Sequence, residues 1–352
     1  MNKNRKVRLL IATQYLNEGG VGRQIHYLAR HLDSRCFDVH LAVFRAKHLF
    51  FTDLFNGEQV CARVLNGGRQ VGIRTAAELI EMCRDLRPDI LHLFGGKANH
   101  LGGLATLFFD VPAVIFSVRS ANNRLVNHLL YRLLRPRQTL TIVNSGGIKR
   151  ELVERSGYRD EEVLVMPNFL DTESFRPCSR VERLAAMQAL GVDAETCLLA
   201  CIGRIARQKN QLAILKALKR LRDGGKLPRN FRFLFVGRAY DAVYAARVRR
   251  MRQSLGLEDL TDFLEPRKDI VSVYHALDGI FQPSAYEGLS NVVIEAQACG
   301  TPVALSREGD NDDLVREGET GISFSIKGAR QVGEALERLI HLCRDEVRRR
   351  RI

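Results

Sequence analysis

The sequence predicts an α/β protein made of two doubly wound domains, each with a parallel sheet between layers of helices. Short apolar, β-branched runs alternate with helical patterns from one end of the chain to the other, which is typical of parallel sheets flanked by helices. The length of 352 residues suits two domains of about 150 residues each. Residues 166–177 contain two prolines and no clear period, so we expect the linker between two series of elements there.

The elements are expected in two series. The strands of the first series are expected at residues 7–13, 39–44, 90–94, 113–118, 140–143 and 163–166. Helical patterns lie between them, for example over residues 22–32, 76–86 and 148–156. After the linker the strands are expected at 197–202, 231–236, 279–282 and 302–305, with helices that include 211–222, 242–255, 291–299 and 329–343. Ligands of such sheets bind at the carboxyl ends of the strands, so functional residues are expected there.

Composition and charge exclude several classes of protein. Hydrophobic residues make up 45% and charged residues 27% of the chain, which are values of globular proteins and not of disordered or collagen-like ones. The net charge of +14 is divided evenly, with +7 in residues 1–175 and +7 in residues 176–352. Because basic and aromatic residues also do not interleave, we expect no nucleic-acid partner.

Cysteine spacing and apolar runs set further limits. The eight cysteines are scattered without a Cys-x-x-Cys pair, and the nine histidines show no His/Cys spacing, so we expect reduced thiols and no metal site. No uncharged apolar run approaches the ~18 residues of a spanning helix, and the N-terminus lacks the apolar region of a signal peptide. We therefore expect a cytoplasmic protein.

One basic segment stands apart, because residues 111–150 carry seven basic residues and no acidic one. Within it, five leucines recur at helical spacing between residues 125 and 134, and Arg124, Arg132 and Arg135 take much of the other face. Such a helix can lie on an anionic membrane surface, or it can bury its leucines in the core and leave a solvated basic face. We keep both interpretations, so peripheral contact with the inner face of a membrane is an open expectation.

In each series, a glycine-containing turn follows the first strand. Residues 17–23 read NEGGVGR, and residues 203–209 read GRIARQK. Glycine lets the backbone approach a ligand, and a helix N-terminus offers free N–H groups to an anion. In the second turn, Arg204, Arg207 and Lys209 lie at the positive end of a helix dipole, which disfavours cations. An anion such as a diphosphate would relieve this conflict.

A third motif lies after the strand expected to end at residue 282, where residues 283–302 read PSAYEGLSNVVIEAQACGTP. Ser290 can N-cap a helix that Gly300 ends. Glu287 precedes this helix and Glu295 lies in its second turn. Carboxylates at this position can accept hydrogen bonds from sugar hydroxyls, and the peptide N–H groups at the start of the helix suit an anion.

The combination resembles the retaining glycosyltransferases of family 4. The E-x7-E spacing of Glu287 and Glu295, followed by EAxAxGxPV, is similar to their motif, and Gly203, Arg204 and Lys209 fit G-R-x4-K. Weaker matches are GGVG at 19–22, NS at 144–145, PN-x-x-D at 167–171 and GDNDDLV at 309–315. The resemblance covers nearly the whole chain. It implies the GT-B fold: a Rossmann-like acceptor domain at 1–170 facing, across a cleft, a nucleotide-sugar donor domain at 171–352, whose last helix can cross back to the first.

The resemblance also implies a reaction and roles for residues. A hexose or N-acetylhexosamine would pass with retention, without metal or cofactor, from a nucleoside-diphosphate sugar to a lipid-linked or saccharide acceptor, in cell-surface polysaccharide or glycolipid biosynthesis. Arg204 and Lys209 would bind the donor diphosphate and Glu287 the donor sugar, so these three residues are the catalytic candidates. The other implied donor contacts are Gly20, Gly203, Gly288, Leu289, Ser290, Asn291 and Glu295, of which Glu295 would bind the ribose.

The chain departs from the family pattern in its first half. Arg119 stands where the family often has a histidine; it cannot act as a base near neutral pH, but it can bind an acceptor phosphate or a sugar hydroxyl. Asn168 and His100 are further candidates for such a contact. Phe169 replaces a usual glycine, and Phe94 stands where a second histidine is common, which leaves His92 with a structural role.

Two alternative functions stay open at this point. A sugar-nucleotide 2-epimerase of similar fold would isomerise its substrate without an acceptor, and a carbohydrate-binding relative would have lost catalysis. The Asp-x-Asp sequence at 310–312 resembles a metal motif of another glycosyltransferase fold, but it aligns with GDNxxLV, so we expect no metal there. The sequence leaves the donor base, the sugar, the acceptor and the oligomeric state open.

Overall fold

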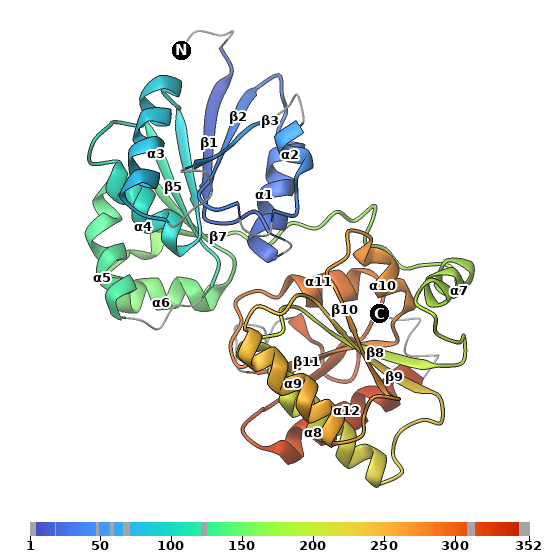
Figure 1. The fold of residues 1–352 in the computed structure, drawn as a ribbon. Helices are drawn as coiled ribbons and strands as arrows, with labels where there is room; N and C mark the ends of the chain where they lie inside the picture. The colour runs from blue at the N-terminus through green and yellow to red at the C-terminus, as the bar shows by residue number, and fades with distance from the viewer. Residues whose placement is uncertain are drawn as a thin grey trace. The chain divides into compact units, whose positions relative to one another are not determined.

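A computed structural model describes residues 5–17, 19–46, 49–56, 60–65, 71–120, 125–307 and 314–344 of the chain. The chain forms two compact units, Met1–Phe169 and Leu170–Ile352 (Figure 1). Each unit contains a parallel sheet with helices on both faces. The predicted fold class, with two doubly wound parallel sheets, is therefore confirmed.

The first unit has, among its described residues, a seven-stranded parallel sheet in the order β3-β2-β1-β4-β5-β6-β7. The strands are β1 (Val7–Thr13), β2 (Phe37–Val43), β3 (Val60–Val64), β4 (Ile90–Phe94), β5 (Ala113–Val118), β6 (Leu140–Val143) and β7 (Val163–Val165). The helices are α1 (Gly20–His31), α2 (Asp53–Asn56), α3 (Ile73–Leu86), α4 (Gly96–Ala105), α5 (Leu125–Leu134) and α6 (Gly146–Ser156), with short 3₁₀ turns at Arg135–Arg137 and Asp160–Glu162.

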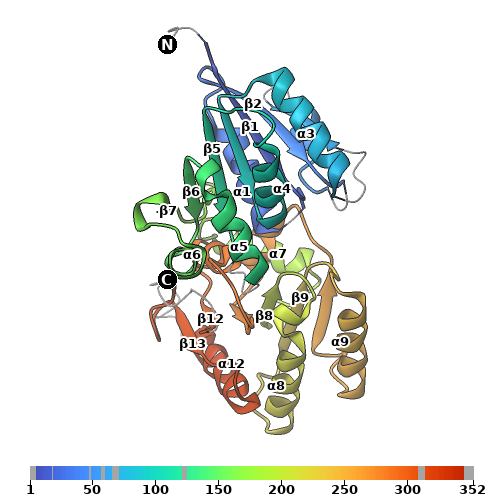
Figure 2. The ribbon, with the colours of Figure 1, turned by 90° about the vertical axis from the view of Figure 1, so that its left-hand side faces the viewer.

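Alternation along β1 builds the two cores of this unit. Leu9 and Ile11 pack on the face covered by α1 and α2, whereas Leu10 and Ala12 pack on the face covered by α3 to α6. Figure 2 shows α3, α4 and α5 together on one side of the sheet and α1 behind it. Because both faces are buried, the strands consist of nearly continuous apolar residues.

The second unit has a parallel sheet of six strands within the described part of the chain, in the order β10-β9-β8-β11-β12-β13. The strands are β8 (Cys197–Ile202), β9 (Phe231–Val236), β10 (Thr261–Leu264), β11 (Gly279–Gln282), β12 (Val303–Ser306) and β13 (Gly321–Phe324). The helices are α7 (Arg180–Ala189), α8 (Gln211–Asp223), α9 (Ala242–Ser254), α10 (Ile270–Ala276), α11 (Asn291–Ala298) and α12 (Ala329–Arg344), with a 3₁₀ turn η4 at Arg207–Lys209. Helices α8, α9 and α12 cover one face, and α7, α10 and α11 cover the other.

Several of these elements were not predicted, and the reasons are physical. Strands β3, β10 and β13 have four or five residues and lack a long apolar run. Helix α4 contains three glycines, which lower helix propensity. Two of them allow close packing on the sheet: a Cβ at Gly102 would lie 2.5 Å from Leu93 Cδ2, and a Cβ at Gly103 would lie 2.7 Å from Phe116 Cζ.

Helix α5 is formed as expected but is oriented differently from the core-facing interpretation. Its buried side chains are His128, Tyr131 and Leu134, whereas Leu125 and three further apolar side chains of the helix are exposed. Of the two interpretations kept above, the one in which the leucines as a set face the core is therefore wrong. Arg124, part of the expected basic face, lies outside the described residues.

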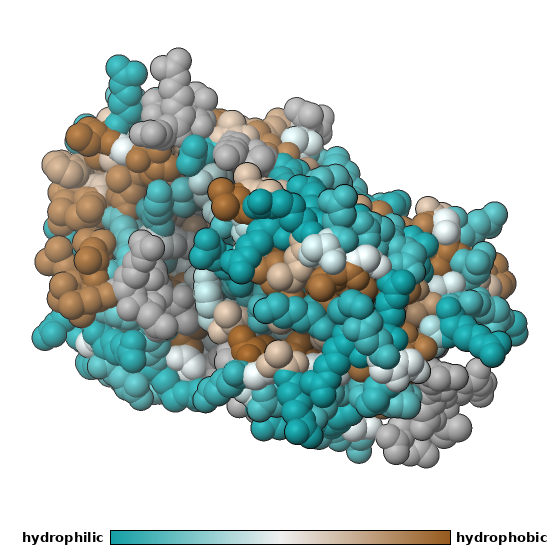
Figure 3. All heavy atoms as spheres, turned by 60° about the horizontal axis from the view of Figure 1, so that its bottom comes forward, coloured by the Kyte–Doolittle hydropathy of each residue, from teal (hydrophilic) through white to brown (hydrophobic). Residues whose placement is uncertain are grey.

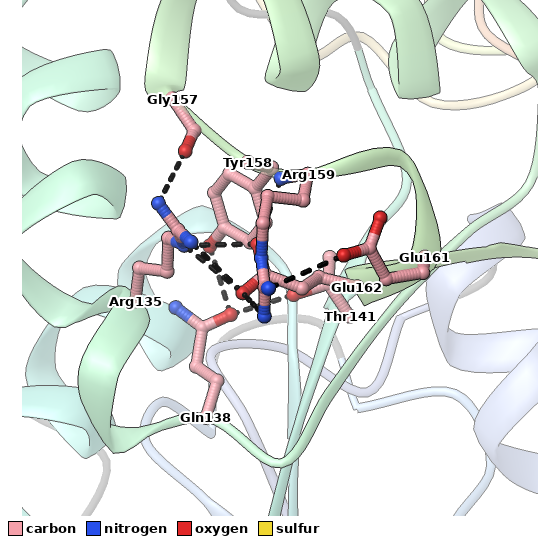
Figure 4. A network of polar contacts seen from close by, with 8 residues as sticks. All are labelled: Arg135, Gln138, Thr141, Gly157, Tyr158, Arg159, Glu161 and Glu162. Carbon is pink, nitrogen blue, oxygen red and sulfur yellow. Dashed lines mark hydrogen bonds and ion pairs between the residues drawn. The ribbon is translucent and has the colours of Figure 1, made fainter.

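Arg135 has a structural role instead of a free basic face. Figure 4 shows it in a polar network with residues of the turn that precedes β7. Its Nε lies 2.9 Å from Glu162 Oε2, and its Nη1 donates to the Gly157 carbonyl at 2.6 Å. Arg159 Nη2 also donates to Glu162 at 3.1 Å. The network joins the end of α5 to the turn that leads into β7.

The state of the cysteines and the search for metal sites and membrane spans bear on the expectations from the sequence. All eight cysteines are free; Cys83, Cys201, Cys299 and Cys343 are buried, and Cys36 and Cys61 are exposed. Within the described ranges, no group of three or more His, Cys, Asp or Glu side chains has the arrangement of a metal site. No helix in the described part of the chain is long and apolar enough to span a bilayer.

Candidate functional site

The candidate donor residues lie at the point where the strand order of the second sheet reverses. Strands β8 and β11 are neighbours, and the sheet extends through β9 and β10 on one side and through β12 and β13 on the other. The loops that leave two such strands at their carboxyl ends diverge, and ligands of open α/β sheets bind in the crevice between them. Here the two loops are residues 203–210 and 283–290.

Two glycines hold the backbone of the first loop in place. Gly203 and Gly237 follow β8 and β9 with φ values of 141° and 143°, a region open to glycine only. A Cβ at Gly237 would lie 2.2 Å from the Gly203 carbonyl oxygen, and a Cβ at Gly203 would lie 2.9 Å from Lys209 Cε. The turns after β8 and β9 also pair directly, since Ile205 N donates to the Arg238 carbonyl at 2.9 Å.

Lys209 and Glu287 form an ion pair between the two loops. Their side chains are only 9% and 14% exposed, so both charges are largely removed from water. Gln208 joins the same loops: its carbonyl accepts from Ala285 N at 2.7 Å, and its Nε2 donates to the Tyr286 carbonyl at 2.8 Å. The sequence-predicted residues Lys209 and Glu287 are thus brought together at the carboxyl edge of the sheet.

The other cations of this loop also have protein partners. Arg204 donates to Gln208 Oε1 at 2.8 Å, and its guanidinium lies 4.7 Å from the ring centre of Tyr240. Arg207 lies 3.8 Å from Asp241. The cluster at the start of α8 is therefore stabilised by a carboxylate, an amide and an aromatic ring in the absence of an anion.

Glu295 lies in the second turn of α11, as expected, and is buried. Tyr274 of α10 donates its hydroxyl to Glu295 Oε2 at 2.7 Å. This bond orients the carboxylate. Ser290 occupies the N-cap position but makes no side-chain capping bond, so the expected capping through its hydroxyl is wrong. Gly288, Leu289 and Asn291 lie in and next to the same turn.

The glycine-rich turn of the first unit begins α1. Gly19 is the N-cap and Gly20 the first helical residue, exposed at the helix start. A Cβ at Gly22 would lie 2.0 Å from the Asn17 carbonyl oxygen, so the fold needs glycine at that position. The turn follows β1, which lies beside β4 at the point where the order of this sheet reverses.

Arg119 and Asn168 lie together in the first unit, after β5 and β7. Arg119 Nη1 donates to Asn168 Oδ1 at 3.2 Å, and its guanidinium lies 5.5 Å from the ring centre of Phe94. Its Nε is buried without a hydrogen-bond partner among the described residues. Burial lowers the pKa of Arg119 to about 10, so the side chain stays cationic near neutral pH.

His92 and His100, the two histidines of this region, lack the environment of a catalytic base. His92 is buried, and its Nε2 lies 2.8 Å from Ser117 Oγ. Burial, with the charge of Arg119, lowers the pKa of His92 to about 3, which fits the structural role predicted for it. His100 packs its ring 4.9 Å from that of Tyr131 on α5, and burial lowers its pKa.

Three side chains and one glycine of the candidate site were not predicted from the sequence: Gln208, Tyr240, Tyr274 and Gly237. One signal was available for Gly237, because Gly-Arg follows both β8 and β9 in the sequence, at 203–204 and 237–238. Tyr274 lies in α10, a seven-residue helix without a clear sequence pattern. The GDNDDLV motif at 309–315 lies largely outside the described residues.

Comparison with known families decides the family of the chain. A family model described as "Glycosyltransferase Family 4" matches residues 18–174, and one described as "Glycosyl transferases group 1" matches residues 182–352. Together they cover nearly the whole chain. The chain belongs to glycosyltransferase family 4. Its two Rossmann-like sheets are those of the GT-B fold.

Similar proteins support this assignment. The D-inositol 3-phosphate glycosyltransferase of Corynebacterium aurimucosum is 25% identical over 73% of this chain and 65% of its own length. The protein of the same name from Saccharomonospora viridis is 34% identical over 59% of this chain and 48% of its own. The chain thus spans less than two thirds of these relatives. A crystal structure of Anabaena HepE in complex with UDP-glucose has a TM-score of 0.83 at 21% identity, covering 97% of this chain and 91% of that one.

Proposed function

We propose that this family 4 member transfers a hexose or N-acetylhexosamine from a nucleoside-diphosphate sugar to an acceptor, with retention and without a metal ion. The observation that carries the proposal is the buried pair of Lys209 and Glu287 at the strand-order reversal of the second sheet. A buried ion pair costs desolvation energy and is weak evidence for stability. At the edge where such sheets bind ligands, a role in binding explains it better.

The cations supply the charge that the leaving group needs. Lys209 uses one of its three ammonium hydrogens on Glu287, and Arg204 offers a planar fork from the same loop. Both can donate to diphosphate oxygens. As the bond between sugar and diphosphate breaks, negative charge grows on the diphosphate, and preorganised donors in a partly dry site stabilise that charge.

The carboxylates of the same site suit the hydroxyl groups of the donor. Glu287 accepts from Lys209 with one oxygen and keeps acceptor capacity for sugar hydroxyls. Glu295, held by Tyr274, suits the ribose hydroxyls. The HepE structure contains UDP-glucose, so UDP-sugars are the first donors to test.

Arg119 is the proposed contact for a phosphate or hydroxyl group of the acceptor. It is a largely buried cation whose Nε lacks a partner among the described residues, and Asn168 holds it in position. The relatives named above are inositol 3-phosphate glycosyltransferases, so a phosphorylated polyol is a reasonable first acceptor, beside lipid-linked and saccharide acceptors of surface polysaccharide or glycolipid synthesis. Since Arg119 is no base, a donor phosphate oxygen takes the acceptor proton on the front face.

The test follows the anomeric carbon by NMR during turnover of UDP-sugars with inositol 3-phosphate, inositol and lipid-linked sugars. We expect a glycoside with the anomeric configuration of the donor, formed equally well with EDTA present. A product of opposite configuration contradicts retention. An isomerised sugar nucleotide formed without acceptor indicates the epimerase, and absence of any product with every donor and acceptor indicates a binding protein.

A further inference from the structure

The solvent-exposed face of α5 consists of leucine and valine side chains, which are usually buried in the core of a protein. Leu125, Val126, Leu129 and Leu133, here called the α5 stripe, are 72%, 65%, 57% and 68% exposed. At about 100° per residue these four positions lie within about 100° of one another around the helix. They therefore form one continuous apolar strip that the fold leaves in solvent.

The opposite face of α5 is fully used by the fold, so the helix is held in this orientation. His128 lies 2.9 Å from Ser156 Oγ and 3.3 Å from Glu151 on α6. Asn99 of α4 donates to the Tyr131 hydroxyl at 3.2 Å. Because buried polar groups must keep their partners, the helix cannot turn its leucines inward without losing these bonds.

The apolar surface continues beyond α5. Helix α4 packs against α5, and the turn that follows α4 exposes Leu107 and Phe108, at 52% and 64%. Figure 3 shows hydrophobic atoms gathered along the left-hand edge, the side on which Figure 1 places α5. Large contiguous apolar patches on a protein surface mark sites of interaction.

The charges around this patch identify its occupant. Arg132 and Arg137 are exposed at and after the end of α5, and no carboxylate pairs with either of them in the described part of the chain. Residues 111–150 contain no acidic residue. A second copy would bring these arginines against their own counterparts, whereas an anionic lipid surface complements them.

We propose that the α5 stripe, with Leu107 and Phe108, inserts into the surface of a membrane that contains anionic lipids, and that Arg132 and Arg137 contact the lipid headgroups. At ten residues α5 is about 15 Å long, which suits a helix that lies in the interface. The contact is made by the leucine face and two flanking arginines; Arg135, held by Glu162, takes no part. The proposal is independent of the sugar-transfer proposal, because vesicle binding is measured without a donor.

The test is co-sedimentation with phosphatidylcholine vesicles that contain or lack phosphatidylglycerol. The wild-type chain should bind anionic vesicles at least about tenfold more tightly than zwitterionic ones. The double variant L129S/L133S should lose about tenfold or more of that affinity, and R132Q should reduce both affinity and its salt dependence. The matched control is V181S/V243S, which removes two side chains, 76% and 72% exposed, on α7 and α9; it should bind as the wild type does.

Three results would overturn the proposal. One is wild-type protein that does not bind anionic vesicles. Another is binding that L129S/L133S leaves unchanged. The third is a wild-type dimer that becomes monomeric in L129S/L133S and binds no vesicles, which would assign the stripe to a second copy. Melting curves check that the variants are folded, and they are expected to be, because the replaced side chains are exposed.

Discussion

Lys209 and Glu287 are each nearly buried, and each is the ion-pair partner of the other. Removing one partner of such a pair leaves an uncompensated buried charge, at a cost of about 3–5 kcal/mol. Replacing both partners by neutral side chains of similar size is close to neutral for stability. Stability and catalysis can therefore be separated at this pair.

We predict that K209A and E287A each reduce kcat/KM by about two orders of magnitude or more, since a preorganised contact to the transition state is lost. Both single variants should also melt lower. The double variant K209M/E287Q should recover most of the melting temperature without recovering activity. Steady-state kinetics and calorimetry measure the two effects, and K219A, which breaks an exposed pair with Asp223, is the control. Recovery of activity in the double variant would show that the pair is structural only.

Tyr274 gives a finer prediction at the same scale. Y274F removes the hydroxyl that orients Glu295, and the loss of a buried hydrogen bond costs about 1 kcal/mol. If Glu295 binds the donor ribose, KM for the donor should rise severalfold while kcat changes little. A fall in kcat with unchanged KM would place Glu295 elsewhere in the reaction.

At the scale of elements, the candidate site depends on backbone contact between the turns after β8 and β9. We predict that G237A reduces nucleotide binding by about tenfold or more, because the added Cβ lies 2.2 Å from the Gly203 carbonyl oxygen at a φ of 143°, and such strain costs about 1–3 kcal/mol. Isothermal calorimetry with nucleotides measures the effect. The control G225A also has a positive φ but meets no atom within 4 Å; equal losses in both variants would rule out the contact as the cause.

The Arg135 network makes the first unit sensitive to acid. Burial alone would raise the pKa of Glu162, but hydrogen bonds from the Arg159 N–H and the Arg135 guanidinium outweigh it and lower that pKa. A carboxyl group with a lowered folded pKa stabilises above its unfolded pKa of about 4.3, and this contribution is lost as the pH falls further. From about pH 6 to about pH 3, the wild type should therefore lose more stability than E162Q. Parallel loss in both proteins, measured by urea unfolding, would contradict this role.

The elements also show what the sequence can predict. Strands β1, β4, β5, β6, β8, β9 and β11 have the predicted bounds because each is a mostly apolar run that is largely buried on both faces. Helix α4 and strand β3 were missed, because packing against Leu93 and Phe116 outweighs the low helix propensity of the α4 glycines, and because β3 alternates buried and exposed residues at an edge. The orientation of α5 also depends on tertiary contacts, namely the partners of His128 and Tyr131.

The site was predictable to a similar degree. Lys209, Glu287 and Glu295 are candidates from their spacing in the sequence, and the structure adds that Lys209 and Glu287 meet. Their partners Gln208 and Tyr274 come from positions without a motif, so only the fold brings them to the site. Arg119 was found as a departure from the family pattern, and its contact with Asn168, 49 residues away, is a consequence of the parallel sheet.

At the scale of the whole molecule, the positive net charge and the family membership each favour particular binding partners. The net charge of +14 favours anionic partners in general, such as sugar nucleotides and acidic lipid surfaces. Membership of glycosyltransferase family 4 favours a nucleotide sugar as one of these anionic partners. A nucleotide that binds only the folded protein stabilises it by about 2.7 kcal/mol at 100 times its Kd, which is a clear melting shift.

The most direct test of a donor site at Lys209 and Glu287 is a thermal-shift comparison of wild type and K209A with UDP, GDP, ADP and CDP and their sugars, in the presence of EDTA. We predict that one nucleotide series raises the melting temperature of the wild type, with UDP and its sugars as the first candidates, and that K209A shows little or no shift. A wild-type protein that is folded but shifts with no nucleotide, or a K209A variant that shifts as much as the wild type, would contradict a donor site at Lys209 and Glu287.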